Sequence, residues 1–354
     1  MDLSFYSGKR VLVTGHTGFK GTWLCQMLAD AGAQVTGYAF EPPTDPNLFD
    51  ISGIERHIDS RIADIRDYEA LRAVFEQVRP QVVFHLAAQP IVRDSYDDPR
   101  YTYETNVMGT VNVLECARLT PGVESMLNVT TDKVYLNPEV PDYAFVEDDP
   151  LDGFDPYSNS KSCSELVTHS YVRSFFAAAG IPVSTARAGN VIGGGDFAPH
   201  RIVPDCVRAV QAGEPLVVRN PQAVRPFQHV LEPLAVYAQI AAAQVADPTL
   251  AGWYNVGPEV EDCVTAGELA TMWCEAWGEG ASWESDASAQ ADGKHEAGFL
   301  RLDTTKLKQV FGWEPRWGIR EALERTAEWT RTWLDGGDVG TCMRAQIAAF
   351  SEQR

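Results

Sequence analysis

Residues 14–21 read "TGHTGFKG", and this stretch decides the expected fold. Gly15, Gly18 and Gly21 lie three residues apart, between an apolar run and a helical pattern over 19–32. Glycines at this spacing permit a tight turn whose backbone can touch a pyrophosphate, and the N-terminus of the following helix favours an anion. Because a strand precedes the loop and a helix follows it, we interpret the loop as a dinucleotide-binding site and not as a structural turn.

The alternation of strand and helix continues through the first half of the chain. Apolar runs alternate with helical patterns, the runs at 34–40, 81–88, 124–131 and 181–191 and the patterns at 68–80, about 99–119 and about 157–179. This order predicts an α/β fold with a doubly wound parallel Rossmann-type sheet. A smaller, mixed α/β C-terminal substrate domain is expected to follow it.

A change in composition near residue 192 suggests the domain boundaries. We expect the cofactor-binding domain to cover 1–191, with a return segment at about 228–258. The substrate domain then covers about 192–227 and 259–354.

Composition excludes several classes of protein. The chain has 354 residues, 45% of them hydrophobic, and a formal net charge of −20, which speaks against nucleic-acid binding. No stretch approaches the roughly 18 apolar residues of a membrane helix, and no targeting segment is evident. The seven cysteines are scattered and never spaced as Cys-x-x-Cys, which indicates free thiols and no metal site. These features predict a cytoplasmic protein that binds neither nucleic acid nor membrane.

Other residues indicate which dinucleotide is bound. The second strand ends in "YAFEPP", where Glu41 can replace the usual ribose-binding Asp and no Arg favours a 2′-phosphate, so NAD is preferred over NADP. In "ADIRD" the Asp64 carboxylate can accept from an adenine amino group, and the small residues of "HLAAQ" permit close approach of the backbone. The candidate cofactor-binding residues are Gly15, Thr17, Gly18, Phe19, Lys20, Gly21, Asp64, Ile65, Leu86, Ala87, Ala88, Gln89, Tyr157 and Lys161.

The stretch "YSNSK" carries Tyr157 and Lys161 four residues apart, so both side chains project from one helix face. A tyrosine hydroxyl is a poor base at neutral pH, but a nearby lysine and a cationic nicotinamide ring both favour the phenolate. Such a pair can take a proton from a sugar hydroxyl while hydride leaves the carbon. A surface Tyr/Lys pair is the simpler explanation of the spacing alone, and the glycine loop makes it the weaker one.

Taken together, "TGHTGFKG", "ADIRD", "HLAAQ", "TTDKVY" and "YSNSK" resemble the extended short-chain dehydrogenases/reductases that act on nucleotide sugars. Within this family the chain is similar to the nucleotide-sugar dehydratases. The longer stretches "HLAAQPIVRDSY", "ARAGNVIGGGDF" and "VRPFQHVLEPL" most resemble the branch that acts on CDP-glucose, and this resemblance covers about residues 8–315. It implies oxidation of the sugar at carbon 4 by NAD, loss of water across carbons 5 and 6, and hydride return to carbon 6. It also implies a homodimer, formed through the helices around 99–119 and 157–179.

The resemblance assigns roles to the residues at one strand end and one helix. Thr131 would hold the sugar hydroxyl, Tyr157 would be the base for oxidation, and Lys161 would hold the nicotinamide ribose. Asp132 would be the acid that protonates the departing hydroxyl. Lys133 stands where related dehydratases commonly have a glutamate base, and the CDP-glucose branch shows the same lysine. Lys133 is therefore either the carbon-5 base, if burial makes it neutral, or an electrostatic anchor for Asp132 and the enolate.

The candidate substrate-binding residues are more scattered along the chain. Two serve the sugar pocket and the others the diphosphate and nucleoside: Ser95 and Tyr96, then Arg187, Asn190, Arg225, Glu296 and Arg301, with His295 beside them. An arginine can bind phosphate through two hydrogen bonds. Nothing in the spacing or charge distinguishes cytosine from thymine or guanine.

Two other functions fit parts of the pattern. Another NDP-sugar 4,6-dehydratase or a 4-epimerase of the same family would share Gly15, Tyr157 and Lys161, although an epimerase has no need for an acid at Asp132. An NAD-sensing regulatory protein would keep the fold without turnover, but the intact catalytic residues speak against it.

Overall fold

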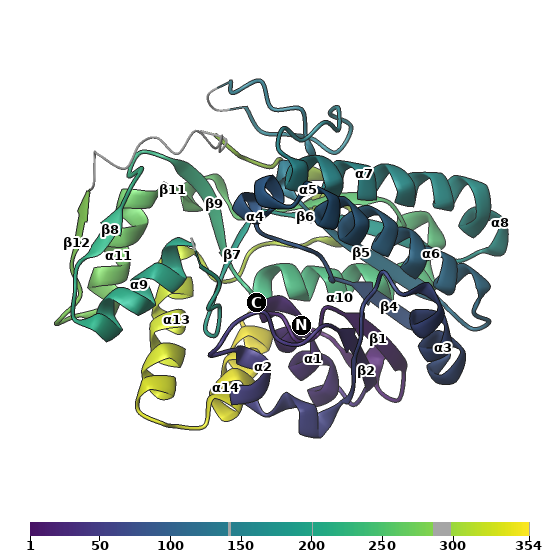
Figure 1. Cartoon of the computed structure of the whole chain (residues 1–354), viewed down its shortest axis with the longest axis horizontal. Helices are drawn as coiled ribbons and strands as arrows, with labels where there is room; N and C mark the ends of the chain where they lie inside the picture. Colours follow the sequence, from purple (N-terminus) through teal and green to yellow (C-terminus); the bar gives the residue numbers. More distant parts are fainter. Residues whose placement is uncertain (141–142, 200, 286–298, 354) are drawn as a thin grey trace.

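A seven-stranded parallel sheet forms the centre of the computed structural model, which describes residues 1–140, 143–199, 201–285 and 299–353 (Figure 1). Every neighbouring pair in this sheet is parallel. The strand order β10-β6-β5-β4-β1-β2-β3 confirms the predicted doubly wound sheet. Its strands are β1 (Arg10–Thr14), β2 (Gln34–Ala39), β3 (Asp59–Ile62), β4 (Val82–His85), β5 (Ser125–Thr131), β6 (Val183–Ala188) and β10 (Trp253–Val256).

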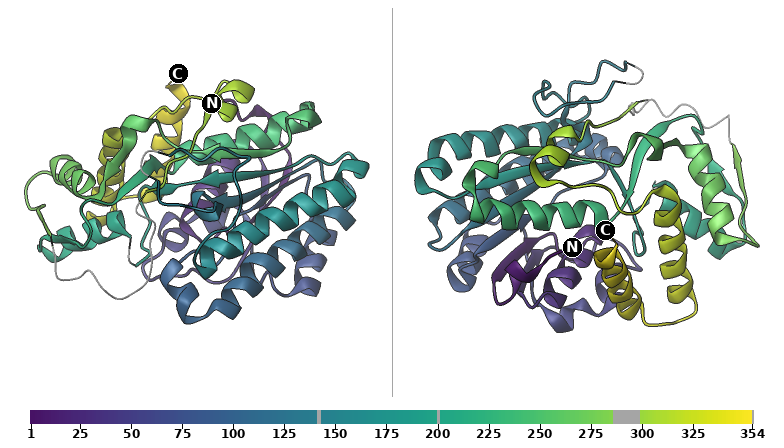
Figure 2. Two further views of the ribbon diagram at one scale, coloured as in Figure 1. Left: turned by 90° about the horizontal axis from the view of Figure 1, so that it is seen from above. Right: turned by 180° about the vertical axis from the view of Figure 1, so that it is seen from behind.

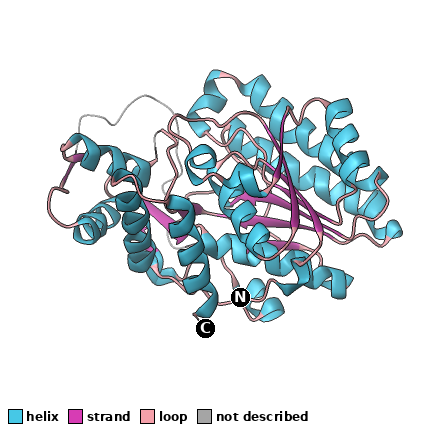
Figure 3. Ribbon diagram, turned by 90° about the horizontal axis from the view of Figure 1, so that it is seen from below, coloured by secondary structure: helices cyan, strands magenta, loops and turns pink. Residues whose placement is uncertain are grey.

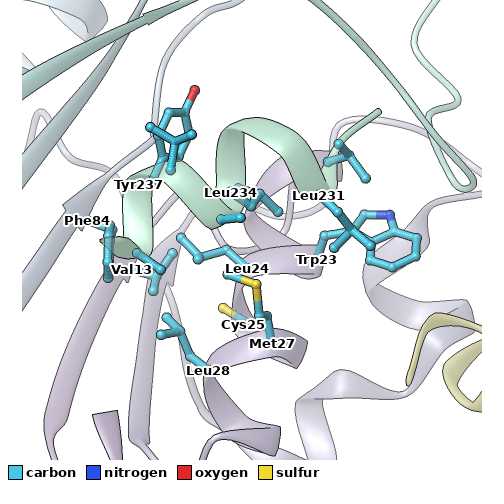
Figure 4. Packing of buried hydrophobic residues seen from close by; sticks show 14 of the residues in the cluster. Val13, Trp23, Leu24, Cys25, Met27, Leu28, Phe84, Leu231, Leu234 and Tyr237 are labelled. Atoms are coloured by element: carbon cyan, nitrogen blue, oxygen red, sulfur yellow. The ribbon is translucent and has the colours of Figure 1, made fainter. Parts of the chain in front are cut away.

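Helices cover both faces of this sheet (Figure 3). On one face α1 (Phe19–Asp30) and α10 (Leu231–Ala246) pack side chains such as Leu24 and Leu234 against Val13 of β1 (Figure 4). The opposite face is covered by α3, α6 and α7, whose bounds are Tyr68–Val78, Gly109–Leu119 and Pro156–Tyr171. The alternate residue Leu12 belongs to that second core, as expected for a strand buried on both faces.

The two long predicted helices are present, and each contains a π-helical segment. The first runs through α5 (Pro99–Tyr103), a π segment at Glu104–Met108, and then α6. The second runs through α7, a π segment at Val172–Phe176, and α8 (Ala177–Ala179). A π segment widens the helix by one residue per turn without ending it.

The predicted single strand over 181–191 is wrong, because the chain changes sheets at Gly189. There β6 ends and β7 (Asn190–Ile192) begins, in a three-stranded sheet of order β11-β9-β7. A Cβ at Gly189 would lie 2.9 Å from the Pro226 side chain and 3.0 Å from the Asp132 carboxylate, so only glycine permits this close crossing.

A smaller part of the molecule lies beside the carboxyl ends of the main strands (Figures 1 and 2). It contains the three-stranded sheet, a two-stranded sheet and three helices around a core that includes Trp273 and Phe227. Its elements are α9 (Ile202–Ala212), β8 (Leu216–Val218), β9 (Val224–His229), β11 (Cys263–Thr265), α11 (Ala266–Trp277), β12 (Trp283–Ser285) and α13 (Ile319–Leu334).

The remaining helices pack mainly on the larger part of the molecule, and α14 also contacts α13. They are α2 (Leu48–Ser52), α4 (Val92–Asp97), α12 (Thr305–Phe311) and α14 (Val339–Glu352). α12 lies against β10, and α14 packs on α1 and α2. The predicted division of the chain into a cofactor-binding domain (1–191 with about 228–258) and a substrate domain (about 192–227 with 259–354) stays a proposal.

Two general properties bear on the expectations above. All seven cysteine thiols are free. Across the described residues we find neither a helix with the length and apolarity to cross a membrane nor a group of three metal-binding side chains.

Candidate active site

The glycine loop forms a cradle at the start of α1. Gly15 has φ +81°, and a Cβ there would lie 2.7 Å from the Ala87 amide nitrogen. A Cβ at Gly21 would lie 2.0 Å from the Gly15 carbonyl oxygen. Gly18 is the N-cap of α1 and offers no side chain, so the helix N-terminus is open to an anion. These features fit a dinucleotide pyrophosphate.

The residues after β4 are held beside this loop. Thr14 Oγ1 accepts hydrogen bonds from the amides of Leu86 and Ala87, both at 3.2 Å. Gln89 is buried and its side-chain amide donates to Thr102, 2.9 Å away. The structure thus places the backbone of 86–88 at the cradle and directs the Gln89 side chain into α5.

Three further predicted cofactor residues, Asp64, Ile65 and Thr17, make contacts within the protein. The Asp64 carboxylate accepts two hydrogen bonds from Arg66, from its backbone nitrogen and from Nε, both at 2.8 Å. Ile65 is buried against Gly109, and Thr17 Oγ1 donates to the Phe40 carbonyl at 2.9 Å. Asp64 is therefore already held by Arg66, a neighbour that its spacing in "DIRD" could have indicated.

The polar triplet at the end of β5 forms a capped turn. Thr131 Oγ1 donates to Asp132 Oδ1 at 3.0 Å and accepts from the Lys133 amide at 3.4 Å, at the start of a 3-10 turn over Asp132–Val134. Asp132 is 1% exposed, and its Oδ2 has no hydrogen-bond partner among the described residues. Burial raises the pKa of Asp132, opposed by the charge of Lys133 and the bond from Thr131. A protonated Asp132 can act as an acid.

Tyr157 lies beside this triplet at the start of α7. The helix is capped by Asp155, which accepts from the Ser158 amide. Burial raises the pKa of Tyr157 to about 12, while a hydrogen bond with Thr131 and the charge of Arg201 lower it. Tyr157 is 9% exposed, so its hydroxyl is held inside the site.

Lys161 follows one helical turn later. Its ammonium group donates to the Val129 carbonyl of β5 at 3.1 Å. Burial and the charge of Lys20 lower the pKa of Lys161 to about 7. The structure therefore brings Thr131, Tyr157 and Lys161 together, as predicted from the sequence.

Two cations lie around the predicted catalytic residues. Burial and Arg201 lower the pKa of Lys20 to about 8, opposed by Asp132 and Asp196. Arg201 precedes α9 and pairs with Asp196, with Nη1 and Oδ2 3.0 Å apart. The sequence interpretation missed Arg201, since only its place shortly after the change of sheets could have indicated it. These cations suit an anionic substrate in a chain whose net charge is −20.

The predicted substrate residues divide into two groups. Asn190 is the first residue of β7 and follows Gly189, which lies against Asp132. The charge of Arg225 in β9 acts on Asp132 and lowers its pKa. Tyr96 is half-buried in α4. The backbone oxygen of Arg301 accepts from the Phe145 amide at 2.9 Å.

Other predicted substrate residues do not reach the site. Arg187 is 0% exposed and binds Glu165, because its side chain points from β6 into the face of the sheet. Ser95 is buried, and its hydroxyl donates to the Val92 carbonyl at 2.6 Å. Glu296 and His295 lie outside the described residues.

Comparison with known proteins places the chain in a family. A sequence model of the family described as GDP-mannose 4,6 dehydratase matches residues 12–326. The chain therefore belongs to this family of nucleotide-sugar dehydratases within the extended short-chain dehydrogenases/reductases.

Among individual relatives, the chain is 43% identical to the CDP-glucose 4,6-dehydratase of Salmonella typhimurium, over 99% of this chain and 98% of the relative. It is 28% identical to a dTDP-glucose 4,6-dehydratase of Xanthomonas campestris, over 96% of this chain and 98% of the relative.

Solved structures share the fold. MoeE5 in complex with UDP-glucuronic acid and NAD has a TM-score of 0.74 and 26% identity, and covers 91% of this chain and 99% of its own. The epimerase Mth375 from Methanothermobacter thermautotrophicus has a TM-score of 0.77 and 27% identity, and covers 94% of this chain and 95% of its own.

Proposed function

We propose that the chain is an NAD-dependent CDP-glucose 4,6-dehydratase, which converts CDP-D-glucose to CDP-4-keto-6-deoxy-D-glucose and water. The observation that carries this proposal is the 43% identity, over nearly the full length of both chains, to the Salmonella CDP-glucose 4,6-dehydratase. The capped Thr131–Asp132 turn beside Tyr157 supports it, because elimination of water needs an acid as well as a base.

The cradle around Gly15 and Gly18 would hold the NAD pyrophosphate, and Lys161 would hold the nicotinamide ribose. MoeE5, a structural relative, is seen with NAD. When bound there, NAD would supply the hydride acceptor for carbon 4 and the hydride donor for carbon 6, and its cationic nicotinamide ring would favour the Tyr157 phenolate.

Tyr157 then takes the proton of the 4-hydroxyl group. Thr131, which lies beside Tyr157, orients the 4-hydroxyl group of the sugar. Arg201 stabilises the phenolate by its charge. Oxidation leaves a ketone at carbon 4, and this ketone makes the proton on the neighbouring carbon 5 more acidic.

Asp132 donates its proton to the 6-hydroxyl, which leaves as water. The unpartnered Oδ2 and the raised pKa of this buried carboxyl suit an acid. Lys133 is the next residue of the same turn and either removes the carbon-5 proton or stabilises the enolate by its charge. Exchange of solvent deuterium into carbon 5 separates these roles: a native exchange rate in Lys133→Met would exclude the base role.

The decisive test is incubation with NAD and a panel of CDP-, dTDP-, UDP- and GDP-glucose. We expect loss of water, seen by mass spectrometry, and a product that absorbs ultraviolet light in alkali, with CDP-glucose preferred. Preference for another nucleotide would indicate another NDP-sugar 4,6-dehydratase. A change of sugar stereochemistry alone would indicate a 4-epimerase, and no reaction would leave an NAD-sensing role.

The proposal includes a cytoplasmic homodimer. The helices α6 and α7, with the π segments beside them, carry exposed apolar side chains that suit a helical interface: Met108, Leu119, Leu166 and Phe175. The free thiols suit a reducing compartment. Light scattering coupled to size-exclusion chromatography tests the dimer.

A further inference from the structure

Glu165 of α7 and Arg187 of β6 form an ion pair whose side chains are both fully buried, with Oε2 and Nη2 3.0 Å apart. Glu165 also accepts from the hydroxyl groups of Thr130 at 2.5 Å and Thr185 at 2.7 Å. Although burial opposes it, the charge of Arg187 lowers the pKa of Glu165 to about 2. Both groups are therefore charged inside the protein.

On one side, this pair belongs to a ladder between α7 and β5. Tyr157, Lys161 and Glu165 lie four residues apart on one helix face. Tyr157 lies beside Thr131, Lys161 donates to the Val129 carbonyl, and Glu165 accepts from Thr130. The catalytic residues are thus fixed to the end of β5 at successive turns of the helix.

On the other side, Arg187 reaches the chain that follows the catalytic triplet. Its Nη1 donates to the Tyr135 hydroxyl at 2.8 Å and to the Glu147 carbonyl at 2.9 Å. The Tyr135 hydroxyl donates to Asn255 Oδ1 at 2.5 Å. The Tyr135 ring stacks on Phe145, with the ring centres 4.8 Å apart.

The network ends on residues 301–303, next to the predicted substrate residue Arg301. The Asn255 side chain donates to the Phe145 carbonyl at 2.8 Å and to the Asp303 carbonyl at 3.2 Å. The Phe145 amide donates to the Arg301 carbonyl, and the Asp303 amide donates to the Phe145 carbonyl. A continuous set of contacts therefore links α7 to the backbone of Arg301.

A buried ion pair is a costly way to gain stability, because apolar side chains of similar volume often serve as well. Its hydrogen bonds instead permit only one arrangement of the groups around it. We propose that Arg187 is a positioning residue, which through Tyr135 holds the catalytic residues of β5 and α7 at a fixed distance from the 301–303 segment. The link to substrate rests on the proposed function.

The first test is Tyr135→Phe, which keeps the ring and the Glu165–Arg187 pair but removes the hydroxyl between Arg187 and Asn255. We expect the KM for CDP-glucose to rise about tenfold. The matched control is Tyr6→Phe, since the Tyr6 hydroxyl is also buried and donates to the Ala238 carbonyl of α10 at 2.7 Å. The control should lose a similar amount of thermal stability with an unchanged KM.

Amide hydrogen exchange tests the same link without substrate. In Tyr135→Phe the amides of Phe145 and Asp303 should exchange faster, while in Tyr6→Phe they should keep the native rate. Native exchange in Tyr135→Phe would overturn the proposal, as would faster exchange with native kinetics. If the wild-type protein does not convert CDP-glucose, the proposed function fails, and the exchange rates still decide the positioning role.

The second test is the double substitution Glu165→Gln with Arg187→Met, which removes both charges of the pair together, so that neither is left buried without the other. We expect kcat to fall roughly 10²-fold while the Kd for NAD stays within about twofold, because the glycine loop is untouched. A double variant with native kcat would show that the pair is structural only and would overturn the proposal.

Discussion

The Lys161 ammonium donates to the Val129 carbonyl, 3.1 Å away, so the lysine of the Tyr/Lys pair is bound to the strand that delivers Thr131. One side chain thus fixes the helix that carries Tyr157 to the strand that carries the polar triplet. The bond orients Lys161, while burial makes its charge costly.

This cost predicts how stability depends on pH. Burial and Lys20 lower the pKa of Lys161 from 10.5 to about 7, so between these values the unfolded chain binds a proton that the folded chain does not. The stability of the ligand-free protein should therefore rise with pH through this range. Lys161→Met should reduce that slope and abolish turnover. The measurement is chemical denaturation across this pH range; an unchanged slope would mean that Lys161 stays charged on folding.

From the raised pKa of Glu232 we expect the opposite dependence of stability on pH, in a lower pH range. Its Oε1 accepts from the amides of Arg316 at 2.8 Å and Trp317 at 2.7 Å, and burial raises its pKa from 4.5 to about 7. Here the folded state binds more protons, so this contribution is full below 4.5 and is lost as the pH rises to about 7. Glu232→Gln keeps an acceptor for both amides and should flatten the fall. A fall of native steepness in this variant would assign it to other groups.

A substitution of Gly15 should weaken cofactor binding by distorting the glycine loop. Gly15→Ala puts a Cβ 2.7 Å from the Ala87 nitrogen at φ +81°, so the cradle must shift. We expect a loss of NAD affinity, measured by calorimetric titration. The free energy of unfolding should fall by more than the ~1–2 kcal/mol that a non-glycine residue costs in a left-handed conformation.

The control for Gly15→Ala is Gly180→Ala. Gly180 has φ +67°, and a Cβ there meets no described atom within 4 Å. It should lose only the conformational part of the stability and keep native NAD affinity. Equal NAD binding by the two variants would mean that the loop is not the pyrophosphate site.

A substitution of Asp132 should separate oxidation at carbon 4 from the loss of water. Asp132→Asn keeps the size of the side chain and removes the acid, so oxidation at carbon 4 should continue while loss of water slows roughly 10²–10⁴-fold. Reduced nicotinamide should then accumulate on mixing with CDP-glucose, measured by its absorbance. Formation of the keto-deoxy product at the native rate would show that another group donates the proton.

The sequence predicted those parts that follow from local pattern. The spacing of Gly15, Gly18 and Gly21 and the alternation of strands and helices sufficed for the parallel sheet. The separation of Tyr157 and Lys161 sufficed for their shared face on α7. These features depend on residues that are close in sequence, where periodicity is informative.

Arg187 shows where such reasoning fails. Parallel strands are buried on both faces, so alternation cannot indicate whether a side chain near a strand end points into a face or out of the sheet edge. Arg187 lies on the same face as Thr185, two residues earlier, and both bind Glu165 of the covering helix. Only the packing of α7 distinguishes an internal ion pair from a phosphate ligand. Arg201 was missed for a related reason, since its partner Asp196 and its neighbour Tyr157 come together only when the two sheets meet.

The π segment at Glu104–Met108 gives the first long helix one residue more than a regular helix would need over the same span. That segment carries Asn106, whose side chain donates to the Gln89 carbonyl at 3.1 Å and to Ser160 Oγ at 2.9 Å. Deleting one residue here would restore regular winding and leave the later turns facing as they do now, whereas a deletion at the start of α6 would rotate those turns by about 100°. Such a rotation would turn the buried side chains of Val113 and Leu114 toward solvent, so this helix should tolerate a change of length within the π segment more readily than within α6.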